Sequence, residues 1–185
     1  MGLINKTVNY LLSREKRRNS ATYKIMSLLV GVLFFLVVLP GIFIEIGFFI
    51  ENHLHLPLNR SIERIISIIS LSAGLAIMAW TTIFQWKIGK GVPTPNAPTR
   101  HLIVSGPYRF CRNPIELGAI LYYLGIGTMI GNILIGIICF LLGLIIGSAY
   151  HKFIEERELE IRFGNEYREY KKKTPFLFPK VRFKL

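Results

Sequence analysis

The chain has 185 residues, of which 51% are hydrophobic and only 18% are charged, whereas soluble domains carry about 25% charged residues. Its 23 Lys and Arg outnumber its 11 acids, all of them Glu, which gives a net charge of +12. So much apolar sequence excludes a disordered chain, and the long apolar runs argue against a soluble nucleic-acid-binding domain. Two cysteines, Cys111 and Cys139, are too few for a disulfide framework. We predict a small membrane protein.

The first 24 residues are basic, and apolar positions alternate with polar ones along part of them. Leu3-Ile4, Val8 and Tyr10-Leu11-Leu12 lie between polar residues, as in a helix that rests on a membrane surface. A basic tail without fixed structure accounts for the pattern equally well. Both interpretations stay open for this N-terminal segment, residues 1–24, and residues 25–185 are predicted to form a single membrane domain.

Three apolar stretches follow, and the last is about twice as long as one span. A hydrocarbon core about 30 Å thick requires about 20 helical residues, and residues 25–50 and 62–86 each meet that length. Residues 115–154 contain Gly131-Asn132 near their middle, which predicts a tight hairpin of two spans, 115–131 and 132–154. The predicted fold is all-α, with about four transmembrane helices and a C-terminal tail, 155–185.

The positive charges test this arrangement independently. Of the 23 bases, six lie in residues 1–24, five in 87–114 and ten in 151–185, and only Arg60 and Arg64 lie elsewhere. With four spans the three basic segments share one side of the membrane, which the positive-inside rule makes cytoplasmic. We therefore expect a multi-pass protein with both termini in the cytoplasm. The run Lys171-Lys172-Lys173 then suits anionic lipid head groups better than nucleic acid.

The loop between the second and third spans is too particular to be a plain connector. Pro93, Pro95 and Pro98 fall within six residues, which excludes a helix and favours an extended, semi-rigid path. Pro114 suits the first helical position of the third span, with Asn113 as its N-cap. Backbone groups that neither helix nor sheet uses are available in this loop for a polar ligand.

The last span continues into a charged stretch, 151–170, which predicts a helix beyond the membrane. His151 and Glu155 are four residues apart and share a face, as do Lys152 and Glu156. Gly164 is expected to end this helix. One interpretation is a solvated helix with weak ion pairs. In the other, adjacent carboxylates at the membrane exit steer a cation or accept a proton.

Two motifs flank the predicted hairpin. Tyr108-Arg109-Phe110-Cys111-Arg112-Asn113-Pro114 with Leu117-Gly118 is similar to the pattern Gly-Pro-Tyr-Arg-x-x-Arg-(His/Asn)-Pro-x-x-x-Gly. Glu155-Glu156-x-x-Leu159, followed by Phe163-Gly164-x-x-Tyr167-x-x-Tyr170 and Pro175-x-x-x-Pro179, matches a C-terminal signature of the same family. Together the motifs resemble those of the isoprenylcysteine carboxyl methyltransferase and phospholipid methyltransferase superfamily of integral membrane enzymes.

This resemblance implies methyl transfer that depends on S-adenosylmethionine and uses no Rossmann sheet. The implied cofactor pocket is formed on the cytoplasmic side by the loop, the hairpin ends and the C-terminal segment. The implied acceptor is a lipid or a lipidated molecule that enters from the bilayer. The resemblance places Glu155 and Glu156 at the reaction centre. It also implies that Tyr167 and Tyr170 help to close the pocket. It assigns cofactor contacts to His101, Leu102, Ile103, Tyr108, Asn113 and Pro114.

Further side chains enter the predicted site through their chemistry. His151 and the paired glutamates are candidate general bases for an amine acceptor, whereas a carboxylate acceptor needs no base. Arg109 and Arg112 suit either the carboxylate of the cofactor or anionic lipid head groups, and for Arg109 we favour the lipid. Glu116 meets either a cationic group of the cofactor or only the positive end of a helix.

Two other classes of membrane protein stay open from the sequence. Membrane sterol reductases share a related C-terminal pocket, but they bind NADPH and are usually much larger. A small transporter or assembly factor would place an ionisable group near the bilayer midplane, for which Glu45 is the candidate. His53 and His55 resemble a metal pair only superficially, because no third ligand lies nearby. No metal is predicted.

Overall fold

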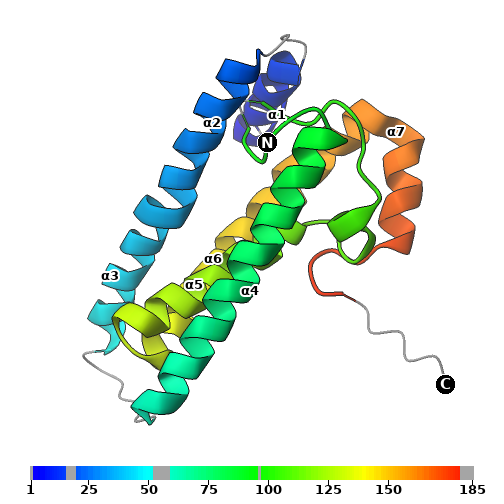
Figure 1. Cartoon of the computed structure of the whole chain (residues 1–185). Helices are drawn as coiled ribbons and strands as arrows, with labels where there is room; N and C mark the ends of the chain where they lie inside the picture. The colour runs from blue at the N-terminus through cyan, green and yellow to red at the C-terminus, as the bar shows by residue number, and fades with distance from the viewer. Residues whose placement is uncertain (1, 16–19, 52–58, 96, 180–185) are drawn as a thin grey trace, which may run out of the picture. The chain divides into compact units, whose positions relative to one another are not determined.

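The computed structural model describes residues 2–15, 20–51, 59–95 and 97–179. Within these ranges all regular structure is helical and no strand occurs, so the all-α prediction is confirmed. The elements, in chain order, are α1 (Gly2–Glu15), α2 (Ala21–Leu33), the π-helical turn η1 (Phe34–Val38), α3 (Leu39–Glu51), α4 (Arg60–Lys87), the 3-10 turn η2 (Gly106–Arg109), α5 (Pro114–Ile130), α6 (Ile133–Tyr150), the π-helical turn η3 (His151–Glu155) and α7 (Glu156–Lys173) (Figure 1).

Among the described residues, three continuous helical segments are long and apolar enough to cross a membrane, namely Ala21–Glu51, Arg60–Lys87 and Ile133–Lys173. They contain the predicted spans 25–50 and 62–86 and all of the predicted span 132–154 except its first residue, Asn132. The fourth predicted span corresponds to α5, an apolar helix of 17 residues, which lies at the lower limit of about 17 residues for a crossing. The membrane class is therefore confirmed, and the number of crossings stays a prediction.

His53, His55 and the bases at 16–18 and 180–184 lie outside the described residues.

The chain forms two compact units. Unit 1 comprises residues 1–28, 79–115 and 149–185, and unit 2 comprises residues 29–78 and 116–148.

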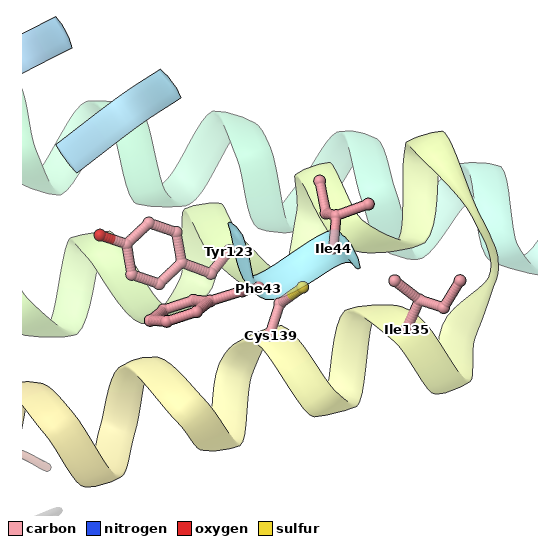
Figure 2. Close-up of a cluster of buried hydrophobic side chains, with 5 residues drawn as sticks. All are labelled: Phe43, Ile44, Tyr123, Ile135 and Cys139. Atoms are coloured by element: carbon pink, nitrogen blue, oxygen red, sulfur yellow. The ribbon is translucent and has the colours of Figure 1, made fainter. Parts of the chain in front are cut away.

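The core of unit 2 joins three apolar helices. Phe43 and Ile44 of α3, Tyr123 of α5, and Ile135 and Cys139 of α6 are buried against one another (Figure 2). The rings of Phe43 and Tyr123 meet edge to face with centroids 5.6 Å apart, a favoured arrangement for aromatic pairs. The helices of this unit also expose large apolar side chains along their outer faces, as helices in contact with lipid do.

Glycines bring the helices of unit 2 into backbone contact. A Cβ on Gly74 of α4 would lie 2.6 Å from the backbone N of Tyr122 in α5, and a Cβ on Gly136 of α6 would lie 2.6 Å from the carbonyl O of Leu124. Helices in lipid lack a hydrophobic driving force for association. Small residues at such contacts allow close van der Waals packing, which holds the helices together instead.

Pro40 disturbs the first membrane helix, and two tyrosines of α5 compensate. Pro40 has no N–H, so the carbonyl O of Leu36 lacks its α-helical donor. In the π-helical turn η1 the N–H of Leu39 donates to the carbonyl O of Phe34. The carbonyl O of Phe35 therefore also lacks a backbone donor. The hydroxyl of Tyr122 donates to Leu36 O at 2.9 Å, and that of Tyr123 donates to Phe35 O at 3.0 Å. Both carbonyls are thereby satisfied, as hydrocarbon surroundings require.

In unit 1 the N-terminal segment forms the helix α1, which contacts η3 and α7. Val8 and Leu11 are buried, so the interpretation as a tail without fixed structure is wrong for the described residues. Gly164 interrupts α7 as predicted: the helical segment that begins at Glu156 ends there, and a second helical segment runs on to Lys173. Gly164 adopts φ 53° and ψ −123°, a conformation open essentially to glycine, and it produces a kink after which the helix resumes.

Candidate functional site

A pocket lies in unit 1, where residues from the end of α4, the 88–113 loop, η3 and α7 meet. Its open volume of about 40 Å³ is below the roughly 300–1,000 Å³ of ordinary ligand pockets, so a ligand of that size has to part the lining side chains. These are Gln85, Thr99, Leu102, Ile103, Tyr108, Arg112, Glu155, Leu159, Tyr167 and Tyr170.

Hydrogen bonds hold the loop that supplies part of this pocket. The N–H of Arg100 donates to the carbonyl O of Gly89 at 2.6 Å, which closes the proline-rich segment into a compact turn. The guanidinium of Arg162 on α7 donates to the carbonyl O of Thr99 and pairs with Glu158 at 2.7 Å. The loop is therefore fixed to α7 through a polar contact that replaces regular secondary structure.

The tail after α7 fixes the other end of the loop. The N–H of Arg112 donates to Pro175 O at 2.9 Å, and the N–H of Asn113 donates to Phe176 O at 3.2 Å. The buried side-chain amide of Asn113 donates to Phe176 O as well, at 3.0 Å. Asn113, expected as the cap of α5, thus joins the tail to the loop. The helix α5 begins at Pro114, as predicted.

Glu156 is the centre of a buried ion-pair network. Its carboxylate pairs with Arg112 at 2.5 Å, with Lys171 at 2.7 Å and with Lys152 at 3.5 Å. Arg112 also donates to the carbonyl O of Thr174 at 2.6 Å. Burial alone would raise the pKa of Glu156, but the hydrogen bonds and charges of Lys171 and Arg112 outweigh it and lower that pKa. Glu156 is therefore ionised at neutral pH and ties α7 to the loop.

Glu155 differs from its neighbour because it lines the pocket. It ends the π-helical turn η3, and its carboxylate is hydrogen-bonded to Nδ1 of His151. Burial acts to raise the pKa of Glu155, yet the charge and hydrogen bond of His151 and the charge of Arg162 lower it overall. The pocket therefore contains an ionised carboxylate, which attracts a cationic group.

A chain of polar contacts forms another wall. The amide Nε2 of Gln85 donates to the hydroxyl of Tyr108 at 2.5 Å, and the hydroxyl of Tyr170 donates to Tyr108 O at 2.6 Å. Burial raises the pKa of Tyr108, Tyr167 and Tyr170, so all three stay neutral phenols. The carbonyl oxygen Oε1 of the Gln85 amide is buried and has no hydrogen-bond partner among the described residues. An orphaned buried amide in a pocket is a ready ligand contact.

Several residues that the sequence predicts for the site do not line the pocket. His101 is exposed on the loop, and Asn113 and Pro114 are buried where the loop meets α5. His151 is hydrogen-bonded to Glu155, which does line the pocket. Glu116 belongs to unit 2, where its carboxylate accepts a hydrogen bond from Ser148 at 2.9 Å.

Arg109 is exposed, with its guanidinium 5.3 Å from the ring centroid of Phe110. That exposed position suits the lipid contact favoured for it.

Three lining residues were missed. Gln85 carried a signal, because a lone amide near the end of an apolar span is costly without a partner. Leu159 stands in the C-terminal motif without an assigned role. Thr99 carried no signal, since its position depends on how the proline-rich loop folds against α7.

Comparison with known proteins relates the segment that supplies most of the lining of this pocket to one family. The model of the phospholipid methyltransferase family matches residues 64–166, more than half of the chain. Protein-S-isoprenylcysteine O-methyltransferases of Mus musculus and Rattus norvegicus are each 29% identical to it over 93 residues, which cover 49% of this chain and 32% of each relative. No solved structure matches the chain. The chain belongs to the phospholipid methyltransferase family.

Proposed function

We propose that this protein transfers a methyl group from S-adenosylmethionine to a carboxylate of a lipid or lipidated molecule in the membrane. The observation that carries the proposal is the ionised Glu155 in a pocket with neutral tyrosines and an orphaned amide. Most residues of this pocket lie within the segment that matches the family. The names of the two relatives, both O-methyltransferases, support the choice of acceptor atom.

The residues of the pocket fit the methyl donor by their chemistry. When bound, S-adenosylmethionine supplies an electrophilic methyl group on a positively charged sulfur. Glu155 suits the cationic groups of this molecule, and the free end of Gln85 suits one of its polar groups. Arg112, whose Nε is buried without a hydrogen-bond partner among the described residues, suits the carboxylate. Tyr167 and Leu102 offer surfaces against which an adenine ring can stack.

The weak basicity of the glutamates at this site favours a carboxylate acceptor over an amine. An amine must lose a proton before it attacks, and a general base works best with a pKa near the operating pH. The pKa values of Glu155 and Glu156 are lowered, which makes both weak bases, and burial keeps the tyrosines protonated. A carboxylate is already nucleophilic, so positioning by the pocket residues supplies the catalysis. His151 then acts as a positioning residue for Glu155.

The reaction site implies a route for each substrate. With both termini in the cytoplasm, as the basic segments predict, the soluble methyl donor enters from the cytosol. The acceptor reaches the site from the bilayer. We propose that the chain crosses the membrane four times, with α5 as the short third span.

The test uses membranes that contain the full chain, S-adenosylmethionine labelled on its methyl group, and an isoprenylated cysteine with a free carboxylate. We expect label in the lipid extract that mild base releases as methanol, because a methyl ester is base-labile. Glu155→Gln should lower the rate at least tenfold. Glu169→Gln, at an exposed pair with Lys172, is the matched control and should leave it unchanged.

Each failure of this test has a distinct meaning. Label that survives base would point to an amine acceptor and overturn the carboxylate assignment. Absence of transfer to this acceptor and to total membrane lipid would overturn the activity. Equal rates for wild type and Glu155→Gln would remove that carboxylate from the reaction.

A further inference from the structure

We propose that a second pocket, in unit 2, binds a membrane phospholipid through its phosphate. This pocket is about 450 Å³ in volume and lies between the first turns of α4 and the end of α5. Arg60 and Arg64 line it together with Ile68 and Met129. The proposal is independent of methyl transfer, because these residues belong to a different pocket from the one that contains Glu155.

The two arginines form a cationic pair that has no counter-ion among the described residues. They lie four residues apart on one face of α4, and both are exposed. Neither makes an ion pair with any described residue, and residues 52–58 contain no Asp or Glu. They also stand in the first two turns of α4, where the helix dipole disfavours positive charge. An anion in this pocket would therefore gain from both guanidinium groups and from the helix terminus.

Glu63, the acid that also lines this pocket, is already used elsewhere. It is 6% exposed, and its Oε1 accepts a hydrogen bond from the N–H of Ile133 at 3.0 Å. Its negative charge thus lies at the positive end of α6, which stabilises it there. The arginines keep a net positive charge for a ligand.

Apolar side chains beside the arginines identify the ligand as a lipid. Ile68 and Met129 are 62% and 60% exposed, and both line the pocket. A free phosphate would gain nothing from such walls, whereas an acyl chain would cover them. Arginine binds phosphate oxygens in a bidentate manner. A phospholipid therefore matches the pocket at both ends, with its phosphate on Arg60 and Arg64 and a chain on Ile68 and Met129.

The test is photo-crosslinking of the purified full chain in nonionic detergent. The probe is a phosphatidylglycerol with a diazirine in one acyl chain, and a diacylglycerol with the same diazirine lacks the phosphate. Mass spectrometry should place the phosphatidylglycerol adduct on peptides that contain Ile68 or Met129. The diacylglycerol should give at least fivefold less adduct there.

Variants and a competitor complete the design. Arg60→Gln/Arg64→Gln should lower the phosphatidylglycerol adduct at least fivefold, while Lys87→Gln, an exposed base at the other end of α4, should leave it unchanged. Excess unlabelled phosphatidylglycerol should displace the probe from the wild-type protein, which keeps the test valid if the double variant fails to fold. Equal adducts from both probes, or displacement by glycerol phosphate as efficient as by the lipid, would overturn the proposal.

Discussion

Two adjacent glutamates carry different tasks, although they are equivalent in sequence pattern. Glu156 is buried and held by Arg112 and Lys171, whereas Glu155 faces the pocket and is held by His151. The pairing of Lys152 with Glu156, which the helical spacing predicts, is present, but at 3.5 Å it is the longest of the three. The shorter partners come from the loop and the end of α7, where four-residue spacing carries no information.

The ion pairs of Glu156 predict a specific dependence of stability on pH. Because the folded-state pKa of Glu156 is lowered, its contribution is fully present above the unfolded-state value of about 4.3. It is lost as the pH falls through the folded-state value. Glu156→Gln should cost about 3 kcal/mol at pH 7, as loss of one partner in a buried pair does, and should flatten the acid limb of the stability curve.

Thermal unfolding in detergent between pH 7 and pH 3 measures this effect. The exposed Glu169→Gln serves as its control and should follow the wild-type curve. A Glu156→Gln protein as stable as the wild type at pH 7, with an unchanged acid limb, would contradict the assignment.

Among the elements, the first membrane helix lacks two backbone hydrogen bonds, which side chains of another helix replace. Pro40 and the turn η1 leave two carbonyl groups without backbone donors inside an apolar helix, and the hydroxyls of Tyr122 and Tyr123 donate to them. The same two tyrosines pack at the core of unit 2 or at its edge. The proline therefore couples η1 to α5 through specific hydrogen bonds rather than through shape alone.

A double-mutant cycle tests that coupling. Tyr122→Phe should lower the free energy of unfolding by about 1 kcal/mol, within the range measured for hydrogen bonds between membrane helices. In a Pro40→Ala background the restored N–H serves the carbonyl O of Leu36, so the cost of Tyr122→Phe should shrink. Unfolding of the four proteins in bicelles gives the coupling energy. An equal cost in both backgrounds would show that the tyrosine hydroxyl does not serve the carbonyl left by the proline.

For the molecule as a whole, the fold was more predictable from sequence than the site. Apolar runs and the Gly, Asn and Pro residues that interrupt or begin helices can be read directly from the sequence. The hairpin at Gly131-Asn132 and the start of α5 at Pro114 therefore appear where predicted. Gly164 also breaks the helix where predicted, although a second helical segment begins after it.

The pocket was predictable where its residues stand in compact motifs, as Tyr108, Arg112 and Glu155 do. Gln85 and Thr99 reach it only through the folding of the proline-rich loop. Their place in the pocket depends on tertiary contacts such as that of Arg162 with Thr99.

The predicted topology of the whole chain has its own test. With four crossings, Ser20→Cys, Ser105→Cys and Asn165→Cys should lie on one side of the membrane and Ser61→Cys on the other. The native cysteines, Cys111 and Cys139, are buried, so an impermeant maleimide applied to sealed vesicles of known orientation reports on the introduced thiols. Separation of the first three positions between the two sides would rule out four crossings.

The central claim is that the pocket of unit 1 binds the methyl donor, and calorimetry with S-adenosylhomocysteine tests it most directly. The purified full chain should bind one molecule. Gln85→Leu removes the orphaned amide and should weaken the affinity about fivefold, the equivalent of one neutral hydrogen bond of about 1 kcal/mol. Lys87→Gln, two residues further along α4, should bind as the wild type does. Absence of binding, or an unchanged affinity for Gln85→Leu, would contradict this account of the pocket.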